Sequence, residues 1–397
     1  MRVLAVGNMY PPHDLGGGYE ITWRSSVQHL RARGHDVRVL TTDYRAPELA
    51  PGSELDEDVH RELNWYWRDH AFPRHSLRER IAIERHNGSV LERHLGTFVP
   101  DAVAWWAMGG MSLTLIERVR RAGLPAVGVV GDEWLRWGPR ADAWLRPLRA
   151  RPRLARAAER LTGLPATVDF GGATWLFNSA AMRDSSPPVD KASVAHPGID
   201  DELFRPAAPP PWRWRLLYLG RLDERKGVHL AIEALRELPD EATLTIQGSG
   251  DAEYTQQLQD RAAAPELRDR VSFSAEPRDR LPKLYCAADV VLFPVQWEEP
   301  WGLVPLEAMA CGRPVVASGT GGSREYLRDG ENCVVYAPRE SPVALAEAVR
   351  RVAGDEPLRA RLRDHGFATA AAHTERKYNE AIERALERVV RELARNV

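Results

Sequence analysis

Residues 290–318 read VVLFPVQWEEPWGLVPLEAMACGRPVVAS and predict one strand–helix–strand unit. Two short apolar runs, 290–293 and 315–318, flank a segment with helical character over 305–310. Strands joined by a helical crossover lie parallel in one sheet, and helices cover both faces of such a sheet. The segment therefore predicts an α/β domain in the C-terminal half of the chain.

The same alternation of short strands and helices runs through the rest of the chain. In the N-terminal half, strands are expected at 3–7, 37–41, 102–106 and 126–130, with a helix over 20–33 that stops at Gly34. In the C-terminal half, strands are expected at 216–220, 244–247, 271–274, 290–293, 315–318 and 333–336. Each half therefore predicts a doubly wound parallel sheet.

Proline-rich stretches between Ser186 and Pro211 separate the two halves. A chain of 397 residues is long enough for two domains of roughly 150 to 200 residues each. We therefore expect an N-terminal domain over 1–190 and a C-terminal domain over 191–374 that face a central cleft. The last helix, within 375–397, is expected to pack back onto the first domain.

Composition and charge narrow the class of function. The formal net charge is −2, which argues against a protein that binds nucleic acid through a global positive field. The three cysteines have no metal-ligand spacing and are odd in number, which favours a reducing cytoplasm over a secreted disulfide framework. No apolar stretch approaches the ~18 residues that a membrane span needs. A cytoplasmic protein is therefore expected.

A cationic turn follows the strand expected at 216–220. Residues 220–227 read GRLDERKG and place Arg221 and Lys226 around a turn that leads into a helix. The carboxyl ends of parallel strands and the helix N-termini beside them attract anions, so this turn suits a diphosphate. Lysine occurs four times among 54 basic residues, which suggests that a compact ammonium is needed at position 226. A solvated basic turn is the alternative.

Two glutamates eight positions apart, Glu299 and Glu307, lie on either side of the start of the 305–310 helix. Glu299 is expected to accept hydrogen bonds from sugar hydroxyls, and Glu307 to hold a ribose diol. Three backbone N–H groups at the helix start are expected to meet phosphate, those of Gly302, Leu303 and Val304. The alternative is an amphipathic helix with ordinary surface acids, although an unpaired acid in this apolar run would be costly to bury.

These motifs together resemble the retaining family-4 glycosyltransferases of the GT-B architecture. The resemblance is carried by Gly220-Arg221-x4-Lys226-Gly227, Glu299-x7-Glu307, Gly312-x-Pro-Val-Val-Ala-Ser318, Gly321-Gly322-x-x-Glu325, Pro11-Pro12, Gly17-Gly18-x-Glu20 and Arg33-Gly34-His35-Asp36-Val37. It implies two Rossmann-like doubly wound domains, with the acceptor on the N-terminal side and the nucleotide sugar on the C-terminal side. Residues 45–170 show no such resemblance, and acceptor specificity is expected there.

The resemblance also implies a reaction. A hexose-type sugar would pass from a nucleoside diphosphate sugar to a glycan, lipid-linked or small-molecule acceptor, with retention of the anomeric configuration. Arg221 and Lys226 are implied to neutralise the diphosphate, so neither a metal nor another cofactor is expected. Glu299 is implied to contact the transferred sugar and Glu307 the nucleotide ribose.

Further expectations concern glycines and one acid near strand ends. Gly17 and Gly18 are implied to approach the donor phosphate and sugar, and Gly248, at another strand end, is expected to flank the nucleotide. Many relatives carry a histidine on the loop after the fourth strand of the N-domain, where this chain has Asp132. Asp132 is expected to serve as a polar contact or proton acceptor, and a helix N-cap is the alternative.

Two further features of the sequence, a group of tryptophans and a basic stretch, concern the acceptor. Five tryptophans crowd the strand ends of the N-domain, where core packing is favoured over stacking on a sugar: Trp105, Trp106, Trp134, Trp137 and Trp144. Residues 146–160 are basic and partly amphipathic. A solvated face is favoured there, and peripheral contact with anionic lipid at the inner face of a membrane, or with a phosphorylated acceptor, is the alternative.

Three other functions fit parts of the pattern. A nucleotide-sugar epimerase or hydrolase can use the same fold, because fold does not fix the reaction. A non-catalytic partner protein is disfavoured by the joint presence of both cations and both glutamates. A nicotinamide dehydrogenase is disfavoured because the first strand leads into GNMYPP, residues 7–12, and not into Gly-x-Gly-x-x-Gly.

Overall fold

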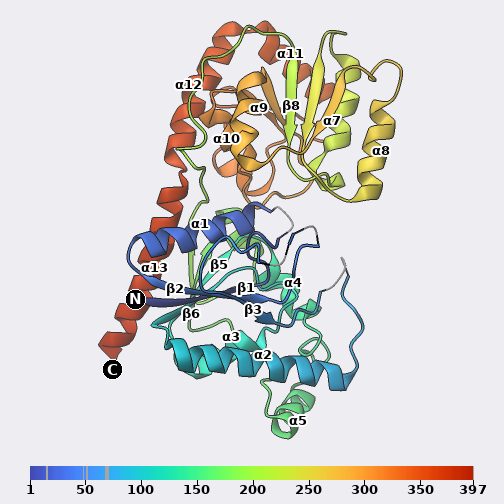
Figure 1. The fold of residues 1–397 in the computed structure, drawn as a ribbon. Helices are drawn as coiled ribbons and strands as arrows, with labels where there is room; N and C mark the ends of the chain where they lie inside the picture. Colours follow the sequence, from blue (N-terminus) through green and yellow to red (C-terminus); the bar gives the residue numbers. More distant parts are fainter. Residues whose placement is uncertain (15–16, 48, 51, 68–70, 397) are drawn as a thin grey trace. The chain divides into compact units, whose positions relative to one another are not determined.

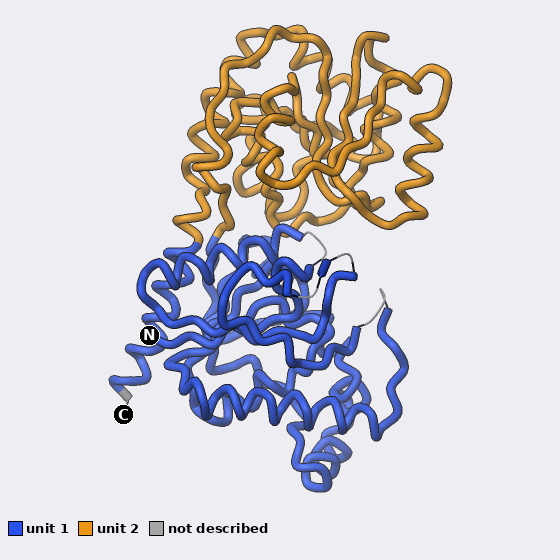
Figure 2. The backbone as a smooth tube through the Cα atoms, in the orientation of Figure 1, with its two compact units in different colours: residues 1–195, 379–397 blue, residues 196–378 orange. Residues whose placement is uncertain are grey.

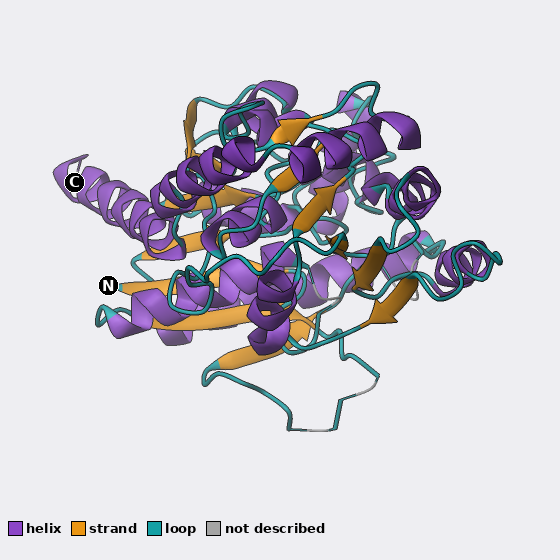
Figure 3. Ribbon diagram, turned by 90° about the horizontal axis from the view of Figure 1, so that it is seen from above, coloured by secondary structure: helices purple, strands orange, loops and turns teal. Residues whose placement is uncertain are grey.

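The computed structural model describes residues 1–14, 17–47, 49–50, 52–67 and 71–396. The chain divides into two compact units, which Figure 2 shows in different colours. Unit 1 comprises residues 1–195 and 379–397, and unit 2 comprises residues 196–378. Each unit is built on one parallel sheet, with helices between the strands (Figure 3).

Unit 1 contains a seven-stranded sheet with the order β3-β2-β1-β4-β5-β6-β7. Its strands are β1 (Arg2–Gly7), β2 (Asp36–Thr42), β3 (Val59–Leu63), β4 (Ala102–Trp105), β5 (Ala126–Val130), β6 (Ala173–Phe177) and β7 (Lys191–Val194). The central strands are mostly apolar; β5 reads AVGVV and is buried at all five positions. A strand covered by helices on both faces has this composition.

Helices cover both faces of this sheet. They are α1 (Gly18–Ala32), α2 (Leu77–Phe98), α3 (Thr114–Arg121), α4 (Trp134–Ala141), α5 (Pro152–Thr162), α6 (Ala180–Ser185) and most of α13 (Glu375–Asn396). Figure 1 shows α1 on one face, with α2 and α3 on the other. A capping box between Ser76 and Glu79 fixes the start of α2.

The C-terminal helix α13 is bonded to α1 and the loop that follows it. Ser26 Oγ donates to Asn379 Oδ1 at 2.6 Å. Glu383 is the common partner of three side chains, those of His29 (2.9 Å), His35 (3.0 Å) and Arg33 (3.4 Å). These contacts place the helix in unit 1 from residue 379 onward.

Unit 2 contains a six-stranded sheet with the order β10-β9-β8-β11-β12-β13. Its strands are β8 (Arg215–Leu219), β9 (Thr243–Gln247), β10 (Val271–Ser274), β11 (Val290–Phe293), β12 (Val315–Ala317) and β13 (Val334–Val335). Its helices are α7 (Val228–Ala234), α8 (Ala252–Ala262), α9 (Leu281–Ala287), α10 (Val304–Ala310), α11 (Pro342–Gly354) and α12 (Glu356–Ala372), with short 3-10 turns η1 (Glu224–Lys226), η2 (Leu235–Glu237), η3 (Arg278–Arg280) and η4 (Gly321–Glu325).

The sheet of unit 2 has a core on each face. Leu216 and Tyr218 of β8 pack in one core with residues of α7 and α11. Leu217, between them, packs in the other core with residues of α9 and α10. Successive strand residues point to opposite faces, so an unbroken apolar strand supplies both cores.

Every strand that the sequence predicts is present, with ends shifted by no more than two residues. Three further strands, β3, β6 and β7, were not predicted. Strand β7 corrects the predicted domain boundary: it pairs with β6 in the first sheet, so the units divide after Ala195 and not after residue 190.

The predicted tryptophans of unit 1 lie in the core. Trp105, Trp106, Trp134 and Trp144 are each at most 2 % exposed, and Trp137 is half-buried against the same core. Core packing, which the sequence favoured over stacking on a sugar, therefore accounts for these side chains.

None of the described helices is long and apolar enough to cross a membrane.

Candidate active site

The predicted residues of unit 2 gather where its strand order reverses. Strands β8 and β11 are neighbours, and each leads into a loop that carries a predicted residue. Lys226 closes η1 after β8, and Glu299 lies in the loop after β11. Lys226 Nζ donates to Glu299 Oε2 at 2.6 Å, across 73 positions of sequence. Open α/β sheets bind ligands at such a reversal.

The turn that carries Lys226 is fixed against the β11 loop. Gly227 has a φ of +73°, and a Cβ atom there would lie 1.9 Å from the carbonyl oxygen of Pro294. Only glycine permits both this backbone conformation and this approach. Gln296 N donates to the carbonyl oxygen of Arg225 at 2.7 Å and ties the two loops together. The position of the Lys226 ammonium therefore follows from the backbone.

Glu299 is buried, with one carboxylate oxygen already in use. Trp297 Nε1 donates at 2.8 Å to the same Oε2 that Lys226 contacts. The backbone carbonyl oxygen of Glu299 accepts a hydrogen bond from Gly322 N at 2.7 Å, and this bond fixes the loop backbone at Glu299. In the part of the chain that the structure describes, no donor reaches Oε1, so this oxygen is free to accept a hydrogen bond from a ligand.

Glu307 is also buried and paired. It lies on α10 and is 3 % exposed. Tyr285 OH donates to Oε2 at 2.7 Å, and Arg278 Nη1 donates to Oε1 at 3.2 Å. Burial raises the pKa of Tyr285, so its phenol remains a donor. The alternative of ordinary surface acids is therefore wrong for both glutamates, since Glu299 is 8 % exposed.

Arginines of the cationic turn have different surroundings. Arg221 is exposed, and its guanidinium makes no hydrogen bond within the described residues. Arg225 pairs with Asp223 at 2.7 Å and lies over the ring of Trp297, 4.8 Å from its centroid. The sequence interpretation missed Arg225 and Trp297. The signal for Trp297 is its place two residues before Glu299.

Glycines at the strand ends have structural reasons of their own. Gly248 has a φ of +146°, and a Cβ atom there would lie 1.9 Å from the carbonyl oxygen of Gly220, so glycine permits two strand ends to touch. Gly302, with a φ of +87°, precedes Leu303 and Val304, which open α10. No described side chain caps that helix start. The contacts of these residues with a nucleotide stay predictions.

The predicted residues of unit 1 lie at two helix starts. Gly17 and Gly18 open α1, and the preceding Leu15 and Gly16 lie outside the described residues. Asp132 follows β5 and lies one residue before Glu133, the N-cap of α4; its Oδ1 accepts from Trp134 N at 3.0 Å. Burial raises the pKa of Asp132 to about 6. Its role as a proton acceptor, and the donor contacts of the two glycines, stay predictions.

A cavity of about 530 Å³ adjoins the loop that carries Glu299. It is lined by segments after β12 and β13, including Ser318, Thr320 and Arg339. Arg339 lies 3.3 Å from Glu298, whose other carboxylate oxygen accepts from Gly321 N at 2.9 Å. A cavity of this size has the volume of a small-molecule site.

Known proteins similar to this chain include several glycosyltransferases. Residues 200–369 match the family model described as glycosyl transferases group 1. The chain is 31% identical to the glycogen synthase of Mycobacterium tuberculosis, over 91% of this chain and 88% of that protein. It is 29% identical to the D-inositol 3-phosphate glycosyltransferase of Frankia alni, over 89% and 90% of the two chains.

Solved structures agree on the fold. Sucrose-phosphate synthase from Thermosynechococcus elongatus superposes over 100% of both chains with a TM-score of 0.74 and 19% identity. An Anabaena protein in complex with UDP-glucose superposes over 98% of this chain and 99% of its own, with a TM-score of 0.68 and 21% identity. The chain therefore has the GT-B fold of two Rossmann-like domains, as the resemblance implied, and it belongs to the group 1 glycosyltransferases.

Proposed function

We propose that this glycosyltransferase takes a hexose-type sugar from a nucleoside diphosphate sugar that is held by unit 2. The observation that carries the proposal is the Lys226–Glu299 ion pair at the β8–β11 reversal, with Glu307 buried on the helix that follows. One cation and two carboxylates match the diphosphate, the sugar hydroxyls and the ribose diol of such a donor. The Anabaena relative solved with UDP-glucose supports this class of donor.

Donor binding exchanges one partner of Lys226 for another. In the structure its ammonium is bonded to Glu299. A donor diphosphate offers a stronger anion, so the ammonium turns to a phosphate oxygen and releases the Glu299 carboxylate. Arg221, exposed and without a hydrogen bond among the described residues, supplies the second cation. These two cations neutralise the diphosphate, as a metal ion does in other enzymes, and the transfer is proposed to be metal-independent.

The two glutamates then hold the two ends of the donor. Glu299 accepts hydrogen bonds from hydroxyls of the sugar through Oε2, which Lys226 has released, and through Oε1, which Lys226 does not contact. Glu307, oriented by Tyr285 and Arg278, accepts from the ribose diol with the remaining lone pairs of its carboxylate. Both contacts fix the sugar relative to the diphosphate.

The transfer breaks the bond between the anomeric carbon and the diphosphate oxygen, which keeps the electron pair. The cations stabilise that negative charge as it develops. The acceptor hydroxyl forms the new bond and gives up its proton, with Asp132 as the proposed acceptor in unit 1. Retention of configuration is part of the proposal and rests on the family resemblance.

The acceptor is proposed to be a glycan, a lipid-linked sugar or a small molecule. The names of the two curated relatives span a polymer and a phosphorylated polyol. Helix α5 carries the basic stretch of unit 1 and exposes Leu154 and Leu161, by 45% and 86%. These features support peripheral contact with anionic lipid at the inner face of a membrane by a protein of the cytoplasm.

A nucleotide screen followed by a transfer assay tests this function. We expect one nucleoside diphosphate to raise the melting temperature, because it binds only the folded chain. With the matching nucleotide sugar and an acceptor, NMR of the anomeric proton should show retention, and EDTA should leave the rate unchanged. Equal donor consumption with and without acceptor would instead indicate an epimerase or hydrolase, and no shift with any nucleotide would contradict the proposal.

A further inference from the structure

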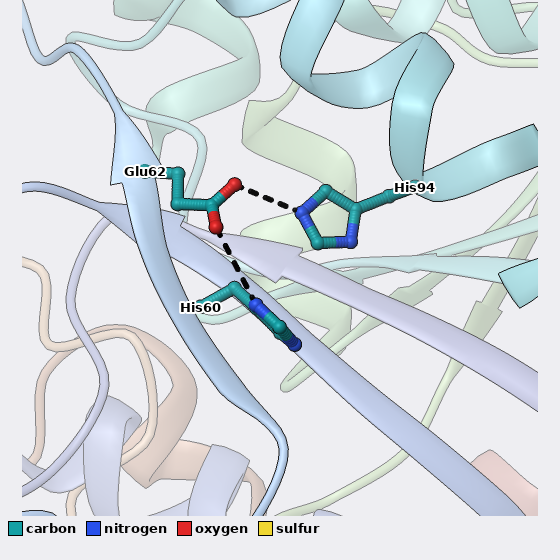
Figure 4. Close-up of side chains that lie close together, drawn as sticks. All are labelled: His60, Glu62 and His94. Atoms are coloured by element: carbon teal, nitrogen blue, oxygen red, sulfur yellow. Dashed lines mark hydrogen bonds and ion pairs between the residues drawn. The ribbon is translucent and has the colours of Figure 1, made fainter. Parts of the chain in front are cut away.

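A separate cluster of metal-ligand side chains lies in unit 1, outside the residues assigned to the donor. His60 and Glu62 are two positions apart on β3 and therefore share one face of the strand. His94 comes from α2, which packs on this strand. Figure 4 shows the three side chains turned toward one another.

The distances in this cluster fit a small metal ion. Glu62 Oε1 lies 3.5 Å from His60 Nδ1, and Glu62 Oε2 lies 3.1 Å from His94 Nε2. One ligand atom from each residue lies within 4.8 Å of the others. Tetrahedral zinc, with bonds of about 2.0 to 2.1 Å, separates its ligand atoms by about 3.3 Å. Glu62 lies close to this separation from both rings, through a different carboxylate oxygen for each.

Asp58 orients the ring of His60 as a carboxylate orients a metal-bound histidine. His60 Nε2 lies 2.7 Å from Asp58 Oδ1. Nδ1, on the opposite side of the ring, faces the carboxylate of Glu62 and is the atom placed to bind an ion. A carboxylate, a histidine and a metal in a row are typical of zinc sites.

His94 is the fixed member of the cluster. Its side chain is 4% exposed, and its Nδ1 is buried without a hydrogen-bond partner among the described residues. The ring is held by packing, with its centroid 4.7 Å from that of His60. The other two side chains are about one-third exposed, so an ion and its water ligand can enter from solvent.

We propose that His60, Glu62 and His94 bind a zinc ion that joins β3, at one edge of the sheet, to α2. Two imidazoles and one carboxylate are a ligand set that zinc accepts, with water as the fourth ligand. Magnesium and calcium prefer oxygen ligands alone. The ion stabilises unit 1 and takes no part in the transfer proposed above.

Of two arginines beside the cluster, Arg93 competes with the ion for Glu62. Arg93 pairs with Glu62, but its side chain is 55% exposed and can turn into solvent. Arg38 holds both oxygens of Asp58 at 3.1 Å and lies over the ring of Phe98, so it stays in place. Removal of the Arg93 charge should therefore strengthen metal binding, a result that a purely hydrogen-bonded cluster does not predict.

Cobalt titration of the EDTA-treated full chain tests the site. We expect one equivalent of Co²⁺ to give the visible absorption of a four-coordinate ion, and Zn²⁺ to displace it and raise the melting temperature. His60→Asn should weaken binding at least tenfold, and Asp58→Asn by about tenfold. Arg93→Gln should tighten it several-fold, and His365→Asn, at an exposed histidine of α12, should match the wild type.

Two results would overturn the proposal. One is the absence of the cobalt absorption at millimolar ion in a chain whose melting temperature still rises with a nucleoside diphosphate. The other is zinc binding that His60→Asn leaves unchanged, which would move the ion to the second such cluster of the described residues, His35, Glu383 and Glu387. A nucleotide response in His60→Asn equal to that of the wild type shows that this variant is folded, so that its loss of zinc binding counts for the site.

Discussion

The Lys226–Glu299 ion pair predicts that two single substitutions have opposite effects on nucleotide binding. Lys226→Met keeps most of the side-chain volume and removes the ammonium that is to hold the diphosphate. Glu299→Gln keeps the shape and removes the charge that holds this ammonium in the free protein. The first variant should bind a nucleoside diphosphate less tightly than the wild type, whereas the second should bind it equally or more tightly.

The magnitudes follow from the contacts. A charge-assisted hydrogen bond to phosphate contributes about 1.5 to 3 kcal/mol, so Lys226→Met should weaken binding by about 10- to 150-fold. The two side chains are 20% and 10% exposed, so the pair lies between exposed pairs, worth about 0 to 1 kcal/mol, and buried ones. Release of Lys226 in Glu299→Gln should therefore tighten binding by no more than about tenfold, while turnover falls because a sugar contact is weakened.

Isothermal titration calorimetry with the nucleoside diphosphate from the screen measures both effects. Lys283→Met is the matched control, because Lys283 is an exposed lysine on α9 of the same unit. Wild-type affinity in Lys226→Met would refute the reasoning. Equal weakening in Lys226→Met and Glu299→Gln would also refute it, because the pair would then act as a structural unit and not as an exchangeable contact.

Three further predictions concern the surroundings of the site and the stability of the two units. Tyr285→Phe removes a donor from the buried Glu307, so it should cost about 1 to 3 kcal/mol in urea unfolding and weaken nucleotide binding; unchanged values for both would contradict the role of the phenol. Burial lowers the pKa of His373 to about 4, whereas a histidine in the unfolded chain has a pKa of about 6.5. The unfolded chain therefore binds the proton first, and up to about 3 kcal/mol of folding stability should be lost as the pH falls from about 6.5 to about 4. His373→Phe should flatten this slope in urea titrations, and an unchanged slope would assign the loss to other groups. Glu383→Ala should speed amide hydrogen exchange in α13, whereas Glu387→Ala on the same helix should not; equal rates in the two variants would show that the three contacts of Glu383 do not anchor the helix.

Buried strands are predictable where their sequences are continuous apolar runs, although β6, which reads ATWLF and is buried at every position, was missed despite this signal. β5 and β11 are buried at every position, which only a sheet covered on both faces allows. β3 reads VHREL and β7 reads KASV, and both lie at edges of the sheet. β3 has two buried residues and β7 has none, so their sequences carry too little apolar signal.

The site was predictable where chain position alone determines it. Lys226, Glu299 and Glu307 follow strand ends, and parallel strands bring those ends to one edge of the sheet. The side chains that orient Glu307 were not predictable, because Tyr285 and Arg278 lie 22 and 29 positions away on another helix and a 3-10 turn. Their contact depends on how α9 and α10 pack.

The proposed zinc cluster could not be predicted from the sequence, for the same reason. His60 and Glu62 have a spacing that any strand can contain, and His94 lies 32 positions beyond Glu62. Only the rotation of α2 about its axis brings the third side chain to the other two. A sequence pattern does not fix that rotation to within the length of a metal–ligand bond.

A crystal structure of the chain with its nucleoside diphosphate tests the central claim most directly. We expect the Lys226 ammonium to have left Glu299 for a diphosphate oxygen, and the Glu307 carboxylate to lie within hydrogen-bond distance of the ribose hydroxyls. A nucleotide that is well ordered elsewhere, with Lys226 still bonded to Glu299, would contradict the assignment of the donor site to these residues.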